Sequence, residues 1–146
     1  MYLSPIIDCF DGAAVSWTIG TSPNADLVNT MLESAIQSLK PDEEPIVHSD
    51  RGAHYRWPGW IERMEDAGLK RSMSKKGCSP DNSACEGFFG HLKNEMFYFK
   101  DWAGVSISQF IDILDPRGAQ SSFSGAGKID VFSPVIVALL QLLEKK

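Results

Sequence analysis

The stretch HSDRGAHY, residues 48–55, places the carboxylate of Asp50 between two imidazoles, directly after the short apolar run Pro45-Ile-Val. Such a run predicts a buried strand, and ligand-binding groups in α/β sheets gather at the carboxyl ends of strands. A loop of ordinary polar residues would explain the same letters. The sharper interpretation is that Asp50 is a catalytic or metal-binding carboxylate at a strand end.

A second candidate set lies on a helix predicted over residues 81–97. Asn82, Glu86 and Lys93 follow one another at intervals of four and seven residues, which puts an amide, a carboxylate and an ammonium group on one helical face. An ordinary solvent-exposed helix face has the same composition. The densest basic cluster precedes this helix and suits phosphate binding, although a solvated loop explains it equally well. Its members are Lys70, Arg71, Lys75 and Lys76.

Composition sets broad limits on the kind of protein. A chain of 146 residues with 43% hydrophobic and 23% charged residues is typical of one globular domain. The net charge of -5 argues against a protein whose whole surface binds nucleic acid, but it permits a local basic patch. The three cysteines contain no CxxC pair, so free thiols are expected rather than a disulfide framework or a zinc ribbon. Without a basic leader or a long apolar run, a cytoplasmic protein with no membrane segment is expected.

Hydrophobic periodicity predicts an α/β fold with a mixed sheet. Two β-prone runs over residues 2–7 and 13–19 flank Asp11-Gly12, which predicts a hairpin. The elements expected next are a helix over 27–39, a strand over 45–49, a helix over 59–67, a strand over 69–74 and the helix over 81–97. This order predicts helices packed on a mixed sheet. Near the end of the chain, the spacing over 129–143 weakly favours a helix.

Four blocks in order, SPIIDCF, HSDRGAHY, SMSKKGCSPDN and EGFFGHLKNE, resemble the integrase core of insertion-sequence transposases of the OrfB type. These proteins belong to the DDE superfamily, which includes the retroviral integrases. Asp50 and Glu86 have 35 residues between them, a spacing that marks this superfamily. The resemblance predicts a partial integrase catalytic core over residues 1–115 and a divergent C-terminal segment over 116–146.

The resemblance implies an RNase H-like fold with divalent metals on two aspartates and one glutamate. By position, Asp50 resembles the second acid and Glu86 the third, so both are predicted to be catalytic and to bind metal. Mg²⁺ or Mn²⁺ is the expected cofactor, because both ions prefer hard oxygen ligands. The ion is expected to bind weakly, since two carboxylates offer fewer ligands than three. The predicted DNA-binding residues are Lys93, Lys75, Lys76, Arg71 and Asn82. The predicted supporting residues are His48, Tyr55 and Gly52, the last by letting the backbone turn sharply.

In the transposase family that this sequence resembles, the first aspartate of the triad lies on a central strand. That strand precedes the hairpin that begins at Tyr2 in this sequence. We therefore expect a sheet that lacks this usual first strand, with either direct pairing of the strands over 2–7 and 45–49 or disorder in an unstable monomer. A replacement strand from residues 128–137 ranks second, and a second copy of the chain could also lend a strand. Should another acid complete the triad, Asp8 and then Asp130 would be the candidates.

The expected function is DNA transposition and integration, by a partial transposase core for metal-dependent DNA cleavage and strand transfer that is inactive on its own. The expected partners are DNA, as transposon ends and target, and either further copies of the chain or a full-length transposase. Two alternatives stay open. One is a non-catalytic remnant that binds DNA or a full-length transposase, and the other is a different RNase H-like nuclease.

Overall fold

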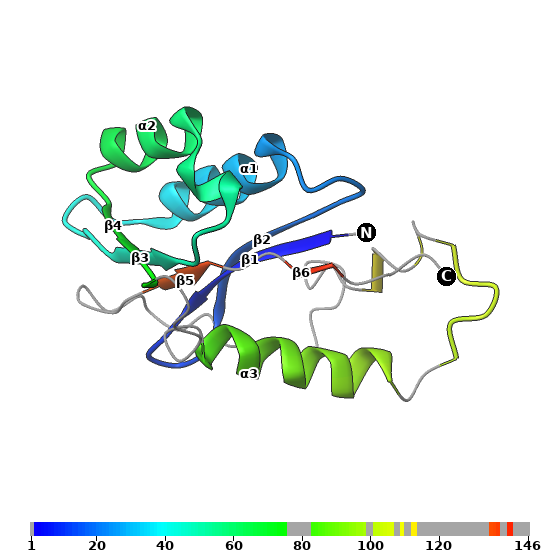
Figure 1. Ribbon diagram of the computed structural model, residues 1–146. Helices are drawn as coiled ribbons and strands as arrows, with labels where there is room; N and C mark the ends of the chain where they lie inside the picture. Colours follow the sequence, from blue (N-terminus) through cyan, green and yellow to red (C-terminus); the bar gives the residue numbers. More distant parts are fainter. Residues whose placement is uncertain are drawn as a thin grey trace.

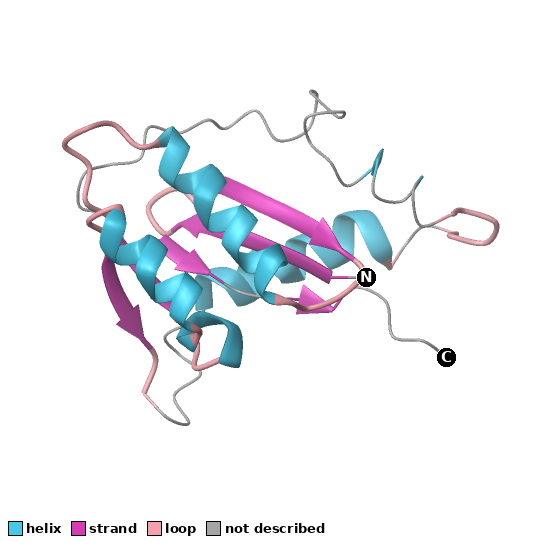
Figure 2. Cartoon of the chain, turned by 90° about the horizontal axis from the view of Figure 1, so that it is seen from above, coloured by secondary structure: helices cyan, strands magenta, loops and turns pink. Residues whose placement is uncertain are grey.

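The computed structural model describes residues 2–75, 83–98, 101–106, 109, 112–113, 135–137 and 140–141. In this part of the chain a sheet carries helices on both faces, as Figures 1 and 2 show. No helix among the described residues combines the length and the apolar character needed to cross a membrane.

The chain opens with the predicted hairpin, in which β1 (Tyr2–Asp8) pairs antiparallel with β2 (Ala14–Gly20). The Asp8 N–H donates to the Ala13 carbonyl at 2.8 Å and closes the turn. Gly12 has a φ of 75°. Residues with a Cβ rarely adopt this conformation, so the Asp-Gly pair specifies this turn.

Helices α1 (Ala25–Ser38) and α2 (Pro58–Asp66) cover one face of the sheet, and α3 (Ser83–Leu92) covers the other (Figures 1 and 2). Successive side chains of β1 point to opposite faces of the sheet. Because helices cover both faces, almost the whole strand is buried. Ile6 belongs to the core cluster with α1 and α2, whereas Ile7 belongs to the cluster with α3. The main members of the first cluster are Val28, Met31, Leu32, Tyr55, Trp60 and Met64, and those of the second are Leu3, Cys85, Phe89 and Leu92.

The place between the hairpin and the parallel pair β3 (Ile46–Ser49) and β4 (Lys70–Met73) is filled by β5 (Val135–Val137). The strand order is β2-β1-β5-β3-β4, with β5 antiparallel to β1 and parallel to β3. The predicted direct pairing of β1 with β3 is therefore wrong, and the replacement strand is present. Without β5 both neighbours would expose unpaired backbone groups.

The weak helical pattern near the end of the chain is also wrong where the structure describes that region. Residues 135–137 form β5, and β6 (Leu140–Gln141) pairs with the other end of β1. The sequence Val-Ile-Val of β5 consists of β-branched residues, which fit a pleated strand better than a helix.

Two further departures concern helices near the candidate site. Helix α3 ends at Leu92 and continues as one π-helical turn, η3 (Lys93–Phe97), instead of one regular helix. A short 3₁₀ helix, η1 (Ala53–Arg56), follows Asp50 and was not predicted. The π turn begins at Lys93 and changes the angular step between the residues that follow, so the regular helical spacing predicted over 81–97 ends there.

Asn24 caps the N-terminus of α1, where its side-chain oxygen accepts a hydrogen bond from the Leu27 N–H at 3.0 Å. We expect Asn24→Ala to lower the free energy of unfolding by about 1 kcal/mol, because that N–H loses its partner. Asn24→Asp retains an acceptor and should cost much less. Urea denaturation measures both variants, and equal losses would contradict the assignment of the cap.

Candidate metal and DNA site

Asp50 directly follows β3 and is exposed to solvent. Its Oδ1 accepts a hydrogen bond from the Gly52 N–H at 2.7 Å. Within the described residues no other hydrogen bond or ion pair occupies this carboxylate. One oxygen is thus held by the backbone, and the other faces solvent as a hard donor of the kind that divalent cations prefer.

The sequence predicted that Gly52 lets the backbone turn sharply, but the structure gives another reason for a glycine at this position. Its φ of -52° and ψ of 144° are open to residues with a side chain. The constraint is space, since a Cβ on Gly52 would lie 2.9 Å from Asp50 Oδ1 and 3.4 Å from Tyr55 Cδ2. The explanation by backbone freedom is therefore wrong, and glycine is needed because the carboxylate and the ring approach it closely.

Tyr55 packs beneath this turn with 1% of its surface exposed. Its ring meets Trp60 edge-on at a centroid distance of 5.1 Å, and its N–H donates to the Gly52 carbonyl at 3.2 Å. Burial raises the pKa of the Tyr55 phenol and the negative charge of Asp50 adds to this rise, whereas the Ser4 hydroxyl opposes it. The proton of Ser4 goes instead to Met31 Sδ at 3.2 Å, which leaves the Tyr55 hydroxyl without a well-formed hydrogen bond among the described residues.

His48 fastens β3 to the chain around β4. Its Nδ1 shares a hydrogen bond with Ser72 Oγ and its Nε2 with Ser74 Oγ, both at 3.0 Å. The Ser74 N–H in turn donates to the Ser49 carbonyl at 3.0 Å. Because both ring nitrogens are engaged, His48 stabilises the strand end that carries Asp50 and has no nitrogen left for a metal ion.

Glu86 lies exposed on α3, next to the buried thiol of Cys85. Burial raises the pKa of Cys85 to about 12, and the charges of Cys9 and Asp50 contribute to the rise. Among the described residues no group of three acids, histidines or cysteines converges in a way that could hold a metal ion.

Asp8 lies in the hairpin, away from Asp50 in the sheet. Its carboxylate accepts a hydrogen bond from the Phe10 N–H at 2.8 Å inside the hairpin turn. In the sheet Asp8 lies opposite Val135, which lies opposite Val47, three residues before Asp50. This register does not favour Asp8 as the next acid of the triad, and its role stays a prediction. The other candidate, Asp130, lies outside the described residues.

The predicted DNA-binding residues differ in how far they are exposed to solvent. Arg71 and Lys75 are exposed, and Lys93 is half-buried. Lys70 of the same basic cluster is paired with Glu44 at 3.5 Å. Lys76 and Asn82 lie outside the described residues.

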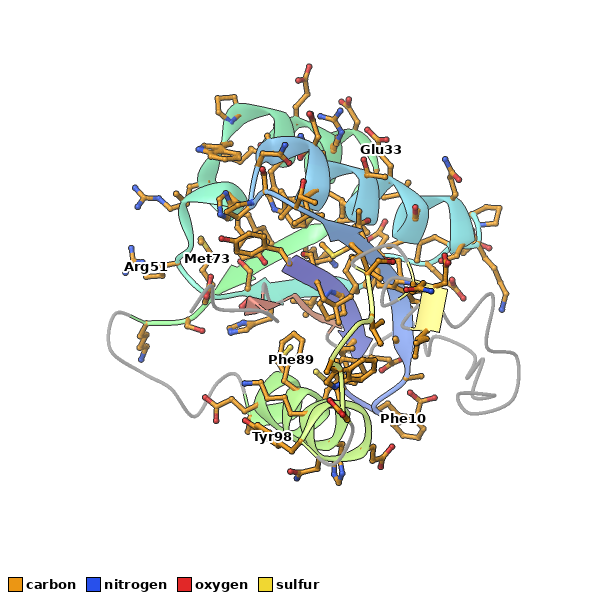
Figure 3. The ribbon with its side chains drawn as sticks, turned by 90° about the vertical axis from the view of Figure 1, so that its right-hand side faces the viewer. Phe10, Glu33, Arg51, Met73, Phe89 and Tyr98 are labelled. Carbon is orange, nitrogen blue, oxygen red and sulfur yellow. The ribbon has the colours of Figure 1, made fainter. Side chains whose placement is uncertain are left out.

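Two basic side chains near Asp50 are not among the predicted DNA contacts. Arg51 and Arg56 are exposed and make no ion pair with any described residue. Figure 3 shows Arg51 extending into solvent from the end of the sheet. The only available sequence signal was their position beside Asp50 in the stretch HSDRGAHYR.

The close contact at Gly52 leads to a testable asymmetry between two glycines. We expect Gly52→Ala to destabilise the chain by about 1–3 kcal/mol, because the new methyl group displaces Asp50 or Tyr55. Gly87 lies within α3, and beyond the helix's own nearby backbone no described atom lies within 4 Å of the place that a methyl group would take, so Gly87→Ala should stabilise by about 1 kcal/mol. Thermal and urea denaturation measure both, and a stable Gly52→Ala variant would contradict the described packing.

Comparison with known proteins gives one consistent result. Residues 1–79 match the family described as the integrase core domain. A probable transposase of insertion sequence element IS1353 from Shigella flexneri is 61% identical over 115 residues, which are 79% of this chain and 22% of that protein. A transposase-like protein of Haemophilus influenzae is 39% identical over 135 residues, covering 89% of this chain and 62% of its own length.

The transposase InsF of insertion sequence IS3A from Escherichia coli is 34% identical over 130 residues, covering 86% of this chain and 45% of that protein. The chain thus spans between about a fifth and three fifths of the length of these curated relatives. No solved structure matches it significantly.

Proposed function

Because the chain belongs to the integrase core family, we propose that it forms part of the catalytic core of an insertion-sequence transposase and acts in DNA transposition and integration. The observation that carries this proposal is the exposed carboxylate of Asp50 directly after β3, one oxygen of which has no hydrogen-bond partner among the described residues. In this proposal residues 1–115 form the core of an RNase H-like fold. Residues 116–146 form a separate segment that lends β5 and β6 to the sheet.

Asp50 and Glu86 are the residues that would hold a divalent cation, Mg²⁺ or Mn²⁺. Both are exposed carboxylates, and one oxygen of Asp50 has no protein partner among the described residues, so the donors suit a hard cation. When bound, such an ion supplies activation of an attacking oxygen and stabilisation of a leaving oxygen at a phosphodiester. Gly52, Tyr55 and His48 position Asp50 by hydrogen bonding and packing.

DNA is the proposed substrate, as transposon end and target. Arg71 and Lys75 present exposed positive charge beside the strand end that precedes the site, and Lys93 lies beyond Glu86 along the chain. Lys76 and Asn82 complete the proposed DNA-binding set. Arg51 and Arg56 extend it, because their exposed guanidinium groups flank Asp50 and suit phosphate oxygens. Full activity would involve further copies of this chain or a full-length transposase.

Two acids offer fewer ligands than three, so the chain by itself should bind metal weakly and should not complete strand transfer. The lack of a three-ligand cluster among the described residues also favours a second candidate, a non-catalytic protein that binds DNA or a full-length transposase. Incubating the purified chain with labelled transposon-end DNA and Mn²⁺ tests the proposal. Binding without joining agrees with it, whereas absence of any DNA binding overturns it.

The DNA contacts can be tested by charge reversal. We expect the double variant Arg71→Glu, Lys75→Glu to weaken DNA binding by about tenfold or more at low salt and to reduce its salt dependence, because phosphate contacts release counterions. Lys40, which is exposed and paired with Glu43 at 3.5 Å, provides a control as Lys40→Glu. Fluorescence anisotropy over a salt series measures all three proteins. Because the control changes the net charge by half as much as the double variant, a loss in the control of about half on a logarithmic scale would point to net charge alone.

A further inference from the structure

Two cysteines that the proposed function does not use meet the same apolar cluster. Cys85 is buried in the cluster that β1 and α3 share, and Cys9, which directly follows β1, packs half-buried against it. The two thiols are not joined in a disulfide. They connect segments that lie far apart in the sequence, namely the hairpin turn and the first half of α3.

The directions of β1 and α3 bring these two cysteines toward each other. In Figure 1 the N-terminal end of α3 lies beside the turn that follows β1, so the strand and the helix run in opposite directions. Figure 3 shows Phe89 rising from α3 toward the sheet and Phe10 of the turn beside the same helix. Ile7 and Phe89 are both members of the shared cluster.

The spacing along each element agrees with this arrangement. Cys9 lies two residues beyond Ile7, a step of about 6.6 Å along an extended chain. Cys85 lies four residues before Phe89, a step of about 6 Å along a helix. Because the two steps are similar in length and lead toward the same end of the molecule, packing of Ile7 near Phe89 directs Cys9 toward Cys85.

We propose that Cys9 and Cys85 are a thiol pair that a small oxidised disulfide, such as oxidised glutathione, converts into an intramolecular disulfide. The Cys9 thiolate attacks one sulfur of the small disulfide, forms a mixed disulfide and releases the first glutathione thiolate. The Cys85 thiol then attacks the Cys9 sulfur, gives up its proton and releases the second glutathione. The two protein thiols lose two electrons, one glutathione disulfide becomes two thiols, and the two protons pass to the released glutathione.

The order of the two steps follows from burial. Cys9 is half-buried and is the thiol that a dissolved disulfide can reach, whereas Cys85 is buried and therefore enters only the second step. The resulting bond would tie the end of β1 to α3 one residue before Glu86. It would therefore fix the helix that carries this acid against the sheet, and a reducing agent would release it.

Incubation of the full chain with oxidised glutathione, followed by digestion without reductant and mass spectrometry, tests the pair. We expect a peptide that joins Cys9 to Cys85, and a rise of the unfolding midpoint on the order of several degrees that dithiothreitol reverses. Cys78→Ser should keep both effects, whereas Cys9→Ser and Cys85→Ser should each abolish them.

Three results would overturn the proposal. The first is a stable glutathione adduct on Cys9 without resolution by Cys85. The second is a bond that uses Cys78 in the wild-type chain. The third is an unchanged midpoint shift in Cys9→Ser. None of these results depends on DNA or metal binding, so the test is independent of the proposed transposase function.

Discussion

Replacing Ile136 by proline should lower the free energy of unfolding by about 3 kcal/mol or more. Ile136 lies at the centre of β5, opposite Ile7 on one side and His48 on the other. Proline has no N–H for a ladder hydrogen bond, and its ring is excluded from central strands. Because β5 joins the hairpin to the parallel pair, its loss would leave two strand edges unpaired.

Ile136→Val is the matched control, since valine keeps the β-branched shape and the backbone N–H. It should cost only about 0.5–1.5 kcal/mol. Urea denaturation followed by circular dichroism measures both variants, and hydrogen exchange locates the effect. The proline variant should lose protection in β1 and β3 together. If it unfolds at the same urea concentration as the valine variant, β5 does not hold the centre of the sheet.

The contrast between the hairpin and β5 shows what local sequence determines. Asp11-Gly12 specifies its turn because the glycine conformation is a local property. Strand β5 has three residues, and short apolar runs fit a strand or a helix equally well. Its position depends on open backbone groups of β1 and β3, which lie far away in the sequence. The sequence pointed to a replacement strand only because the backbone N–H and C=O groups of β1 and β3 need hydrogen-bond partners.

In the candidate site, too, some features follow from local sequence and others depend on tertiary contacts. Asp50 could be predicted because a polar residue after a buried apolar run marks a strand end. The role of Gly52 could not be predicted correctly, since the contact of 2.9 Å between its Cβ position and Asp50 Oδ1 exists only in the folded turn. The two hydrogen bonds of His48 depend on the pairing of β3 with the chain around β4, a tertiary feature without a local signal.

The second large effect concerns divalent cations. We expect Asp50→Asn and Glu86→Gln each to weaken Mn²⁺ binding by at least about tenfold, or roughly 1.4 kcal/mol, because an amide removes the negative charge that a hard cation prefers. Each substitution keeps the size of the side chain, and both positions are exposed, so folding should change little. Glu95→Gln provides the control, since Glu95 is an exposed acid in η3 after the same helix.

A double-mutant cycle on Mn²⁺ affinity tests most directly whether Asp50 and Glu86 bind one shared metal site. Electron paramagnetic resonance of free Mn²⁺ gives the affinities of the wild-type chain, Asp50→Asn, Glu86→Gln and the double variant. If the carboxylates share an ion, either substitution removes most of the affinity and the double variant is scarcely weaker than the single ones. Additive losses from the two substitutions, or an affinity that Glu86→Gln leaves unchanged, would contradict a shared site.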